Sequence, residues 1–315
     1  MKRLLFLGGC LLSLPIWAAQ QVDETIDADP AGYVEIKNTA GRIEVKSWDK
    51  DQVRVVGQLD ELTEKFIFER NGNQVLIQVK IPKHSNRRNV TKEDGDNLVI
   101  YLPEQSHVIY TSVNSDYIAS DYRGGSDISL VNGDISLTEL QGRLRVNTVN
   151  GDIRSQGLSG DIVMETVNGD IKDQGSSGNR LAYQTVNGDI SAQTSIADVM
   201  LETVNGDMDV TLSGVKSVET KTVNGELSLA MTLLESAEVQ ATSVGGEIHL
   251  RFMDELSARF DIQAHAGGNI TNNVSNDKVQ KNKYGPHRWL NFSVSDGSSR
   301  VGISTVNGKI ILDKK

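Results

Sequence analysis

The sequence contains little cysteine and little proline. A single cysteine, Cys10, occurs among 315 residues, so the chain cannot form an internal disulfide. The five prolines lie at positions 15, 30, 82, 103 and 286, which leaves residues 104–285 without one. Because every residue of that interval keeps its backbone N–H, long uninterrupted strand ladders are possible there.

Aromatic residues are also scarce. They make up 5% of the chain, and Tyr183 is the single aromatic residue between Arg123 and Arg251. A core of bulky rings is therefore excluded in this interval. Apolar residues and glycine together reach roughly 45%, which is at the low edge of globular usage, so we expect a folded chain.

The chain has no basic stripe. Its net charge is −10, and residues 123–251 hold 18 acids against nine bases. Since phosphate binding depends on clustered Lys and Arg, this composition argues against nucleic-acid and anionic-membrane partners.

The first residues have the layout of a secretory signal peptide. Lys2 and Arg3 precede an apolar run, Leu4–Leu14, and small residues follow up to Ala19. The run is shorter than the roughly 20 residues that a membrane-spanning helix needs. We predict a signal peptide at 1–19, an exported mature chain without a transmembrane segment, and a periplasmic, cell-surface or secreted location. Removal of Cys10 with the signal would exclude thiolate metal sites and Cys nucleophiles.

A five-residue motif, Val-Asn-Gly-Asp-Ile, repeats through the middle of the chain. It starts at 131, 149, 167, 186, 204, 223 and 244, with spacings of 18, 18, 19, 18, 19 and 21 residues, and it returns at 306. Gly142, Gly160 and Gly178 fall midway, so each unit holds two strands and two glycine turns. The repeat-turn residues that we single out are Asn132, Gly133, Asp134, Asn150, Gly151, Asp152, Asn168, Gly169, Asp170, Asn187, Gly188, Asp189, Asn205, Gly206, Asp207, Asn224, Gly225, Glu226, Asn307 and Gly308.

Two all-β architectures fit this repeat. Asn-Gly is the favoured hairpin pair, which would give an antiparallel meander. Such a meander would need about sixteen strands in one open sheet, more than open sheets normally sustain. We therefore favour a β-solenoid, similar to a parallel β-helix, in which repeats of about 18 residues stack and small aliphatic side chains fill the core.

Stacking would place equivalent residues above one another. We expect columns of Thr148, Thr166, Thr185, Thr203 and Thr222, of the Asn residues, and of Asp134, Asp152, Asp170, Asp189 and Asp207. At the strand spacing of roughly 4.8 Å, each pair of carboxylates would cost about 0.9 kcal/mol in water. The Asp column must then be hydrated, neutralised nearby or bound to cations.

The Thr148–Ile153 and Thr166–Ile171 runs and the closing segment Ser299–Gly308 resemble the bacterial putative-adhesin β-strand-repeat family, a domain-of-unknown-function family of exported proteins. The resemblance implies an exported, non-enzymatic β-solenoid and extends to the opening stretch Tyr33–Val45. The chain ends in Asp313-Lys314-Lys315 without a hydrophobic anchor, which keeps a periplasmic location open.

The flanks are expected to differ from the repeats. We predict a β-rich section at 20–110 with a hairpin around Asn71-Gly72-Asn73, a strand at 98–102 and a basic loop at 83–89. The repeats occupy 111–251. Residues 252–315, where aromatics such as Trp289 return, are predicted to form a cap with a final repeat, or alternatively an aromatic platform for sugar.

The sequence gives no signature of catalysis or of a cofactor. Its five His, at 84, 107, 249, 265 and 287, have no metal-ligand spacing. Acids at equivalent repeat positions should share one environment, whereas a catalytic pair needs two. We predict a non-catalytic adhesin, binding surface or envelope scaffold with an unknown protein or glycan ligand, and self-association is possible. The alternatives are a carbohydrate-active β-helix enzyme and a calcium-stabilised repeat protein.

Overall fold

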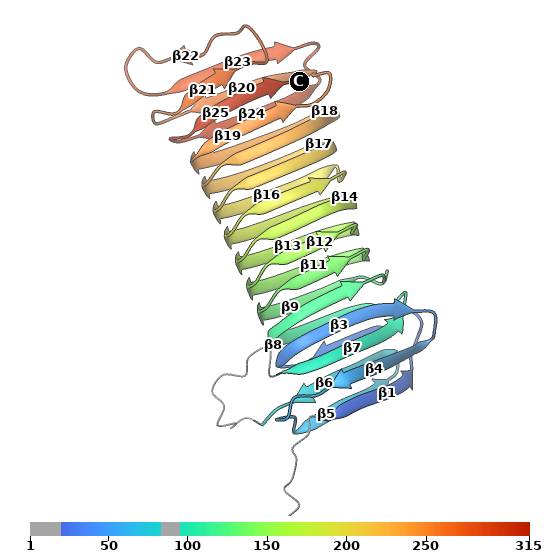
Figure 1. Cartoon of the computed structure of the whole chain (residues 1–315). Helices are drawn as coiled ribbons and strands as arrows, with labels where there is room; N and C mark the ends of the chain where they lie inside the picture. The colour runs from blue at the N-terminus through green and yellow to red at the C-terminus, as the bar shows by residue number, and fades with distance from the viewer. Residues whose placement is uncertain (1–19, 83–94) are drawn as a thin grey trace, which may run out of the picture.

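The computed structural model describes residues 20–82 and 95–315, and these form 25 β-strands and no helix (Figure 1). The predicted all-β class is confirmed. The predicted signal peptide with Cys10 and the predicted basic loop lie outside the described residues. In the part of the chain that is described, no helix has the length and apolar character of a membrane span.

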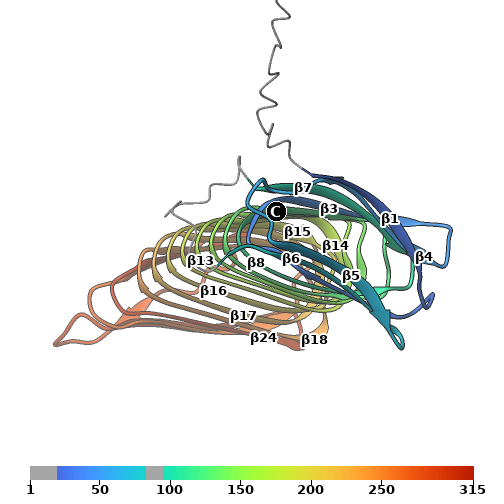
Figure 2. The same cartoon turned by 90° about the horizontal axis from the view of Figure 1, so that it is seen from below.

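The strands lie in two walls that face each other across a narrow core (Figure 2). In spatial order, the first wall contains β5 (Lys65–Asn71), β6 (Gln74–Lys80), β2 (Tyr33–Lys37), β8 (His107–Ser120), β9 (Ser126–Asn132), β11 (Gln141–Asn150), β13 (Ser159–Asn168), β14 (Ile171–Asn187), β16 (Asp198–Asn205), β17 (Met208–Asn224), β18 (Leu227–Gly245), β24 (Ser299–Thr305), β20 (Ala258–Ala264), β23 (Arg288–Val294) and β22 (Gln280–Lys281).

The second wall is built in the same way. It contains β1 (Gln21–Asp27), β4 (Gln52–Gln58), β7 (Asp96–Pro103), β3 (Ala40–Trp48), then β8 again, β10 (Ile135–Thr138), β12 (Ile153–Gln156), β14, β15 (Ile190–Thr194), β17, β18, β19 (Glu247–Phe252), β25 (Lys309–Lys314) and β21 (Asn269–Asn272). The long strands β8, β14, β17 and β18 run from one wall into the other.

In the middle of the chain each strand pairs in parallel with the strand one sequence repeat away. Leu144 of β11 lies beside Ile162 of β13, and Thr148 lies beside Thr166, a step of 18 residues. The step becomes 19 where the sequence repeat lengthens, as between Thr166 and Thr185. One repeat of sequence therefore makes one coil of the stack.

The core is a thin layer of aliphatic side chains. Leu144, Val146 and Ile153 have no exposed surface, while the alternate residues Arg145 and Asn147 face solvent. This period of two is the pattern that the sequence showed. Tyr183, the lone aromatic of the repeats, is also fully buried.

Both ends of the stack are closed by strands that return out of sequence order. At one end, β2 and β3 lie between β8 and the later strands β6 and β7. At the other, β24 lies between β18 and the earlier strand β20. The outermost strands are antiparallel at both ends of the first wall and at the N-terminal end of the second wall, and among them is the predicted hairpin, β5–β6. At the C-terminal end of the second wall, β21 is parallel to β25. The sheet thus continues across residues 110 and 252, where the sequence predicted boundaries.

Candidate functional site

The Asn-Gly-Asp turns line one edge of the stack, where the first wall turns into the second. Each Asn side chain donates from Nδ2 to Oδ1 of the Asn one coil earlier, over distances of 2.6–3.0 Å from Asn132 to Asn224. Val244-Gly245-Gly246 lacks the amide, so the column stops there, and Asn307-Gly308 lies one coil further on. The predicted Asn column is thus present and tightly bonded.

The Asp column is neutralised by the backbone and by nearby cations. From Asp116 to Asp207, one carboxylate oxygen of each acid accepts the backbone N–H of the next column residue at 2.7–3.0 Å, ending at Glu226. The N–H of Asp189 and the ammonium of Lys172 hold the pKa of Asp170 below its usual range. Arg154 forms an ion pair with Asp152 at 2.6 Å. Together these contacts offset the repulsion that the sequence predicted.

The same contacts leave the acids poorly placed to bind metal. One oxygen of each carboxylate already faces an N–H donor, and the described residues contain no group of three His, Cys, Asp or Glu side chains that could hold an ion. Calcium in proteins takes six to eight oxygen ligands.

We therefore expect calcium to leave the stability of the mature chain unchanged. Thermal melts in millimolar calcium should match those in sodium chloride of equal ionic strength, and chelator should have no effect. A calcium-specific rise in melting temperature that Asp170→Asn abolishes would contradict this expectation.

A column of exposed valines runs beside the turns, and the sequence reasoning missed it. The residue before each Val is buried, and it is Thr in most coils and Ser112, Leu130 or Ser243 in the others. Each Val therefore points outward and is exposed by 37–45%. The column contains Val113, Val131, Val149, Val167, Val186, Val204, Val223, Val244 and Val306. The signal was available, since a buried Thr column in an alternating strand requires an outward Val column.

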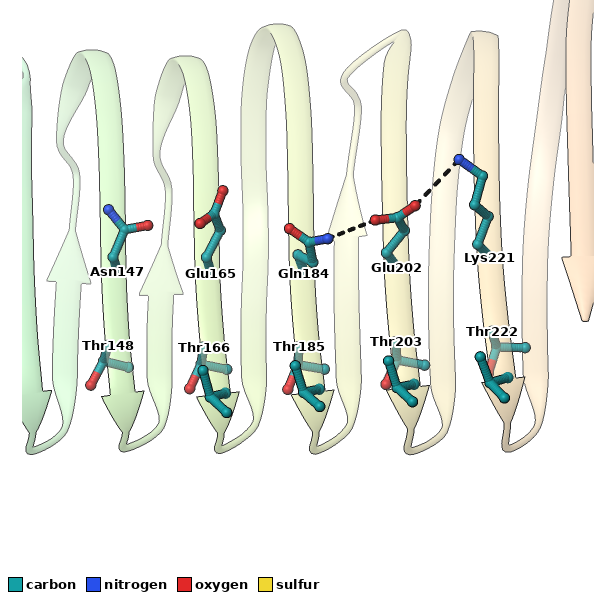
Figure 3. A pocket seen from close by; sticks show the side chains of 14 residues that line it. Asn147, Thr148, Glu165, Thr166, Gln184, Thr185, Glu202, Thr203, Lys221 and Thr222 are labelled. Carbon is teal, nitrogen blue, oxygen red and sulfur yellow. Dashed lines mark hydrogen bonds and ion pairs between the residues drawn. The ribbon is translucent and has the colours of Figure 1, made fainter.

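A groove of about 560 Å³ follows this column on the outer face of the first wall. Four of the valines form one side, and the other side is a row of polar residues, one per coil: Asn147, Glu165, Gln184, Glu202 and Lys221 (Figure 3). Gln184 donates to Glu202 at 2.7 Å, and Lys221 pairs with Glu202 at 3.3 Å. These five residues occupy equivalent positions but differ in type, so the charge and hydrogen-bonding groups of the groove change from coil to coil.

None of the four histidines that the structure describes lines this groove. His107 lies 3.0 Å from Asp127 near one end of the stack, and His249 lies 2.6 Å from Asp313 on the second wall. His265 and His287 stack on each other in the C-terminal part, with ring centroids 5.1 Å apart. His84 lies outside the described residues.

Comparison with known proteins places the chain in a family. The solved structures that it resembles include a "putative cell adhesion protein" from Clostridium sporogenes (11% identity, 94% of this chain and 100% of that chain, TM-score 0.25) and a "putative lipid binding protein" from Parabacteroides distasonis (13%, 94% and 96%, TM-score 0.45). A "putative adhesin" from Bacteroides fragilis is similar too (12%, 94% and 98%, TM-score 0.38). No curated protein matches the chain. The Toastrack DUF4097 family matches residues 33–313, and the chain therefore belongs to that family.

Proposed function

We propose that this chain is an exported, non-catalytic β-solenoid that binds a protein or glycan of the bacterial envelope along its outer wall. Parallel pairing at steps of 18 or 19 residues supports the solenoid. Stacked coils make a stiff support on which a long surface keeps its shape. We place the protein in the periplasm or at the cell surface because of its signal-like N-terminus.

The valine groove is the observation that carries this proposal. A row of half-exposed valines is a contiguous apolar strip, and such strips on soluble proteins mark binding surfaces. Covering the exposed part of one valine would contribute on the order of 0.5–1 kcal/mol. Several coils together would therefore give useful affinity, and the polar row opposite them would select the partner.

The charges in the groove support binding rather than acid–base chemistry. The carboxylate of Glu202 already has two partners in the groove, the Gln184 amide and the Lys221 ammonium. A general acid needs a raised pKa, usually through burial. The carboxyl groups whose pKa is raised, Asp96 and Asp173, are buried in the core instead.

One observation favours a glycoside hydrolase as the second candidate. Glu165 and Glu202 line the same groove and lie two coils apart, roughly 9.6 Å along the wall. This is near the upper limit of the carboxyl spacing in inverting enzymes. Release of reducing ends from envelope polysaccharides by the mature chain, abolished in Glu165→Gln and Glu202→Gln, would establish this candidate over ours.

A pull-down from envelope fractions tests the binding proposal. The bait is the mature chain, compared with a groove variant, Val186→Glu/Val204→Glu, and with Gln174→Glu/Gln193→Glu on the outer face of the second wall. Both variants add two charges at exposed positions. We expect the same partner with wild type and with the second-wall variant, and its loss with the groove variant.

Equal capture by all three baits would contradict the proposal. Equal thermal melts of the three proteins are the control that the groove variant is folded.

A further inference from the structure

A second hollow lies on the first wall near its C-terminal end, away from the valine groove. It has a volume of about 570 Å³, and strands β18, β24, β20 and β23 line it in that order. It exists because β24 returns between β18 and β20. Gly302 of β24 has no side chain, so the Gln240 amide lies over it and forms part of the floor.

Two arginines stand side by side in this hollow. Arg300 of β24 and Arg259 of β20 are register partners on neighbouring strands, and both are exposed. Like charges directly opposite each other on a sheet are destabilising. Within residues 20–82 and 95–315, neither guanidinium has an ion pair or hydrogen bond, although acids outnumber bases in the chain.

Neither nearby acid pairs with the two arginines. Asp261 accepts from the Gln263 amide at 3.2 Å and, with the Asn291 amide oriented to donate, from Asn291 at 3.1 Å. Glu238 is the register partner of Arg300, and among the described residues it forms no ion pair with it. The two guanidiniums therefore keep free N–H donors on neighbouring strands, and a carboxylate accepts paired N–H bonds from arginine.

An aromatic stack continues the same surface. Trp289 lies two residues before Asn291 on β23, so both side chains face outward from the first wall. The ring of His287 lies over Trp289 with centroids 5.4 Å apart, and His265 lies beyond it. A half-buried indole offers a flat apolar surface with a polar edge, which suits the apolar face of a sugar ring.

We propose that this hollow binds a carboxylate-bearing saccharide, such as a uronic-acid oligosaccharide. Arg259 and Arg300 take the carboxylate, the amides of Gln240 and Asn291 bond hydroxyl groups, and Trp289 packs against a neighbouring sugar ring. The site is separate from the valine groove, so it can fail without affecting the function proposed above.

Calorimetry with the mature chain tests this site. The probes are galacturonate and glucuronate oligosaccharides, their neutral methyl esters, and a poly-glutamate peptide of similar charge. We expect binding of an oligouronate that weakens as salt rises, and at least about tenfold weaker binding of the ester, since charge-assisted bonds are lost.

Variants distinguish specific binding at the hollow from nonspecific attraction to positive charge on the wall. Arg259→Gln/Arg300→Gln should lose at least about tenfold in affinity, and Trp289→Ala should also weaken binding. Arg143→Gln/Arg145→Gln removes two exposed arginines of the same wall on β11 and should bind as wild type does. The proposal is overturned if neither oligouronate binds, if ester or poly-glutamate binds equally well, or if both arginine variants lose affinity equally.

Discussion

Gly169→Ala is expected to destabilise the protein by about 3 kcal/mol, near the upper end of the usual cost of overpacking. A Cβ at Gly169 would overlap the carbonyl oxygen of Gly151 in the coil below. The residue has no left-handed backbone conformation, so the effect comes from the clash alone. The two coils cannot separate easily, because the Gly151 N–H donates to the carbonyl oxygen of Asn168 at 3.1 Å.

Gly245→Ala is the matched control. Gly245 lies at the same edge, also without a left-handed backbone, and the atoms nearest to an added Cβ are 3.8 Å away. Urea unfolding should show a clear drop in the midpoint for Gly169→Ala and little change for Gly245→Ala. Equal midpoints for the two variants would mean that the coils are not packed at the observed distance.

Asp96→Asn is expected to remove a large part of the pH dependence of stability. Asp96 is buried between the walls near the N-terminal end, where one of its oxygens accepts the N–H of Asp60 at 3.0 Å. Burial raises its pKa from 3.8 to about 6. The folded state therefore holds a proton that the unfolded chain releases, so stability is greatest at low pH and falls as pH rises from about 4 to 6.

The size of this loss follows from the shift. A shift of two pKa units corresponds to roughly 2–3 kcal/mol of unfolding free energy. The wild type should lose this stability between pH 4 and pH 7, whereas the stability of Asp96→Asn should change little over the same range. A smaller dependence should remain, because burial also raises the pKa of Asp173. The measurement is urea unfolding across this pH range, with Asp198→Asn, an exposed acid, as control.

An unfolding free energy of the wild type that rises with pH in this range would contradict a raised pKa of Asp96. So would a wild type and an Asp96→Asn variant whose curves run parallel.

The repeat carried enough information to predict the strand pattern and the columns of Thr, Asn and Asp. Equal spacing fixes which residues meet between coils, and alternation fixes which of them face inward. The valine column follows from the same two rules. It was not predicted because the columns considered were those of Thr, Asn and Asp. The repulsion between stacked Asp carboxylates could be predicted from the sequence. The backbone N–H groups that offset this repulsion could be identified only from the geometry of the turns.

The ends of the stack could not be predicted in this way. Arg259 and Arg300 are 41 positions apart and meet because β24 enters the first wall between β18 and β20. The motif that returns at 306 marks the coil of β24 as a repeat, whereas β20 and β23 carry no motif, so the sequence did not show that Arg259 would lie beside Arg300. The buried acids Asp96 and Asp173 were equally hidden, since an isolated Asp in a strand usually faces solvent.

Photo-crosslinking in the envelope tests the central proposal, that the valine groove is the binding surface, most directly. A photoreactive amino acid is placed at position 186 or 204 in the groove, or at position 174 or 193 on the opposite wall. Irradiation of intact cells should give one and the same covalent adduct from positions 186 and 204 and none from positions 174 and 193. Adducts that form equally from both walls, or only from the second wall, would contradict the account.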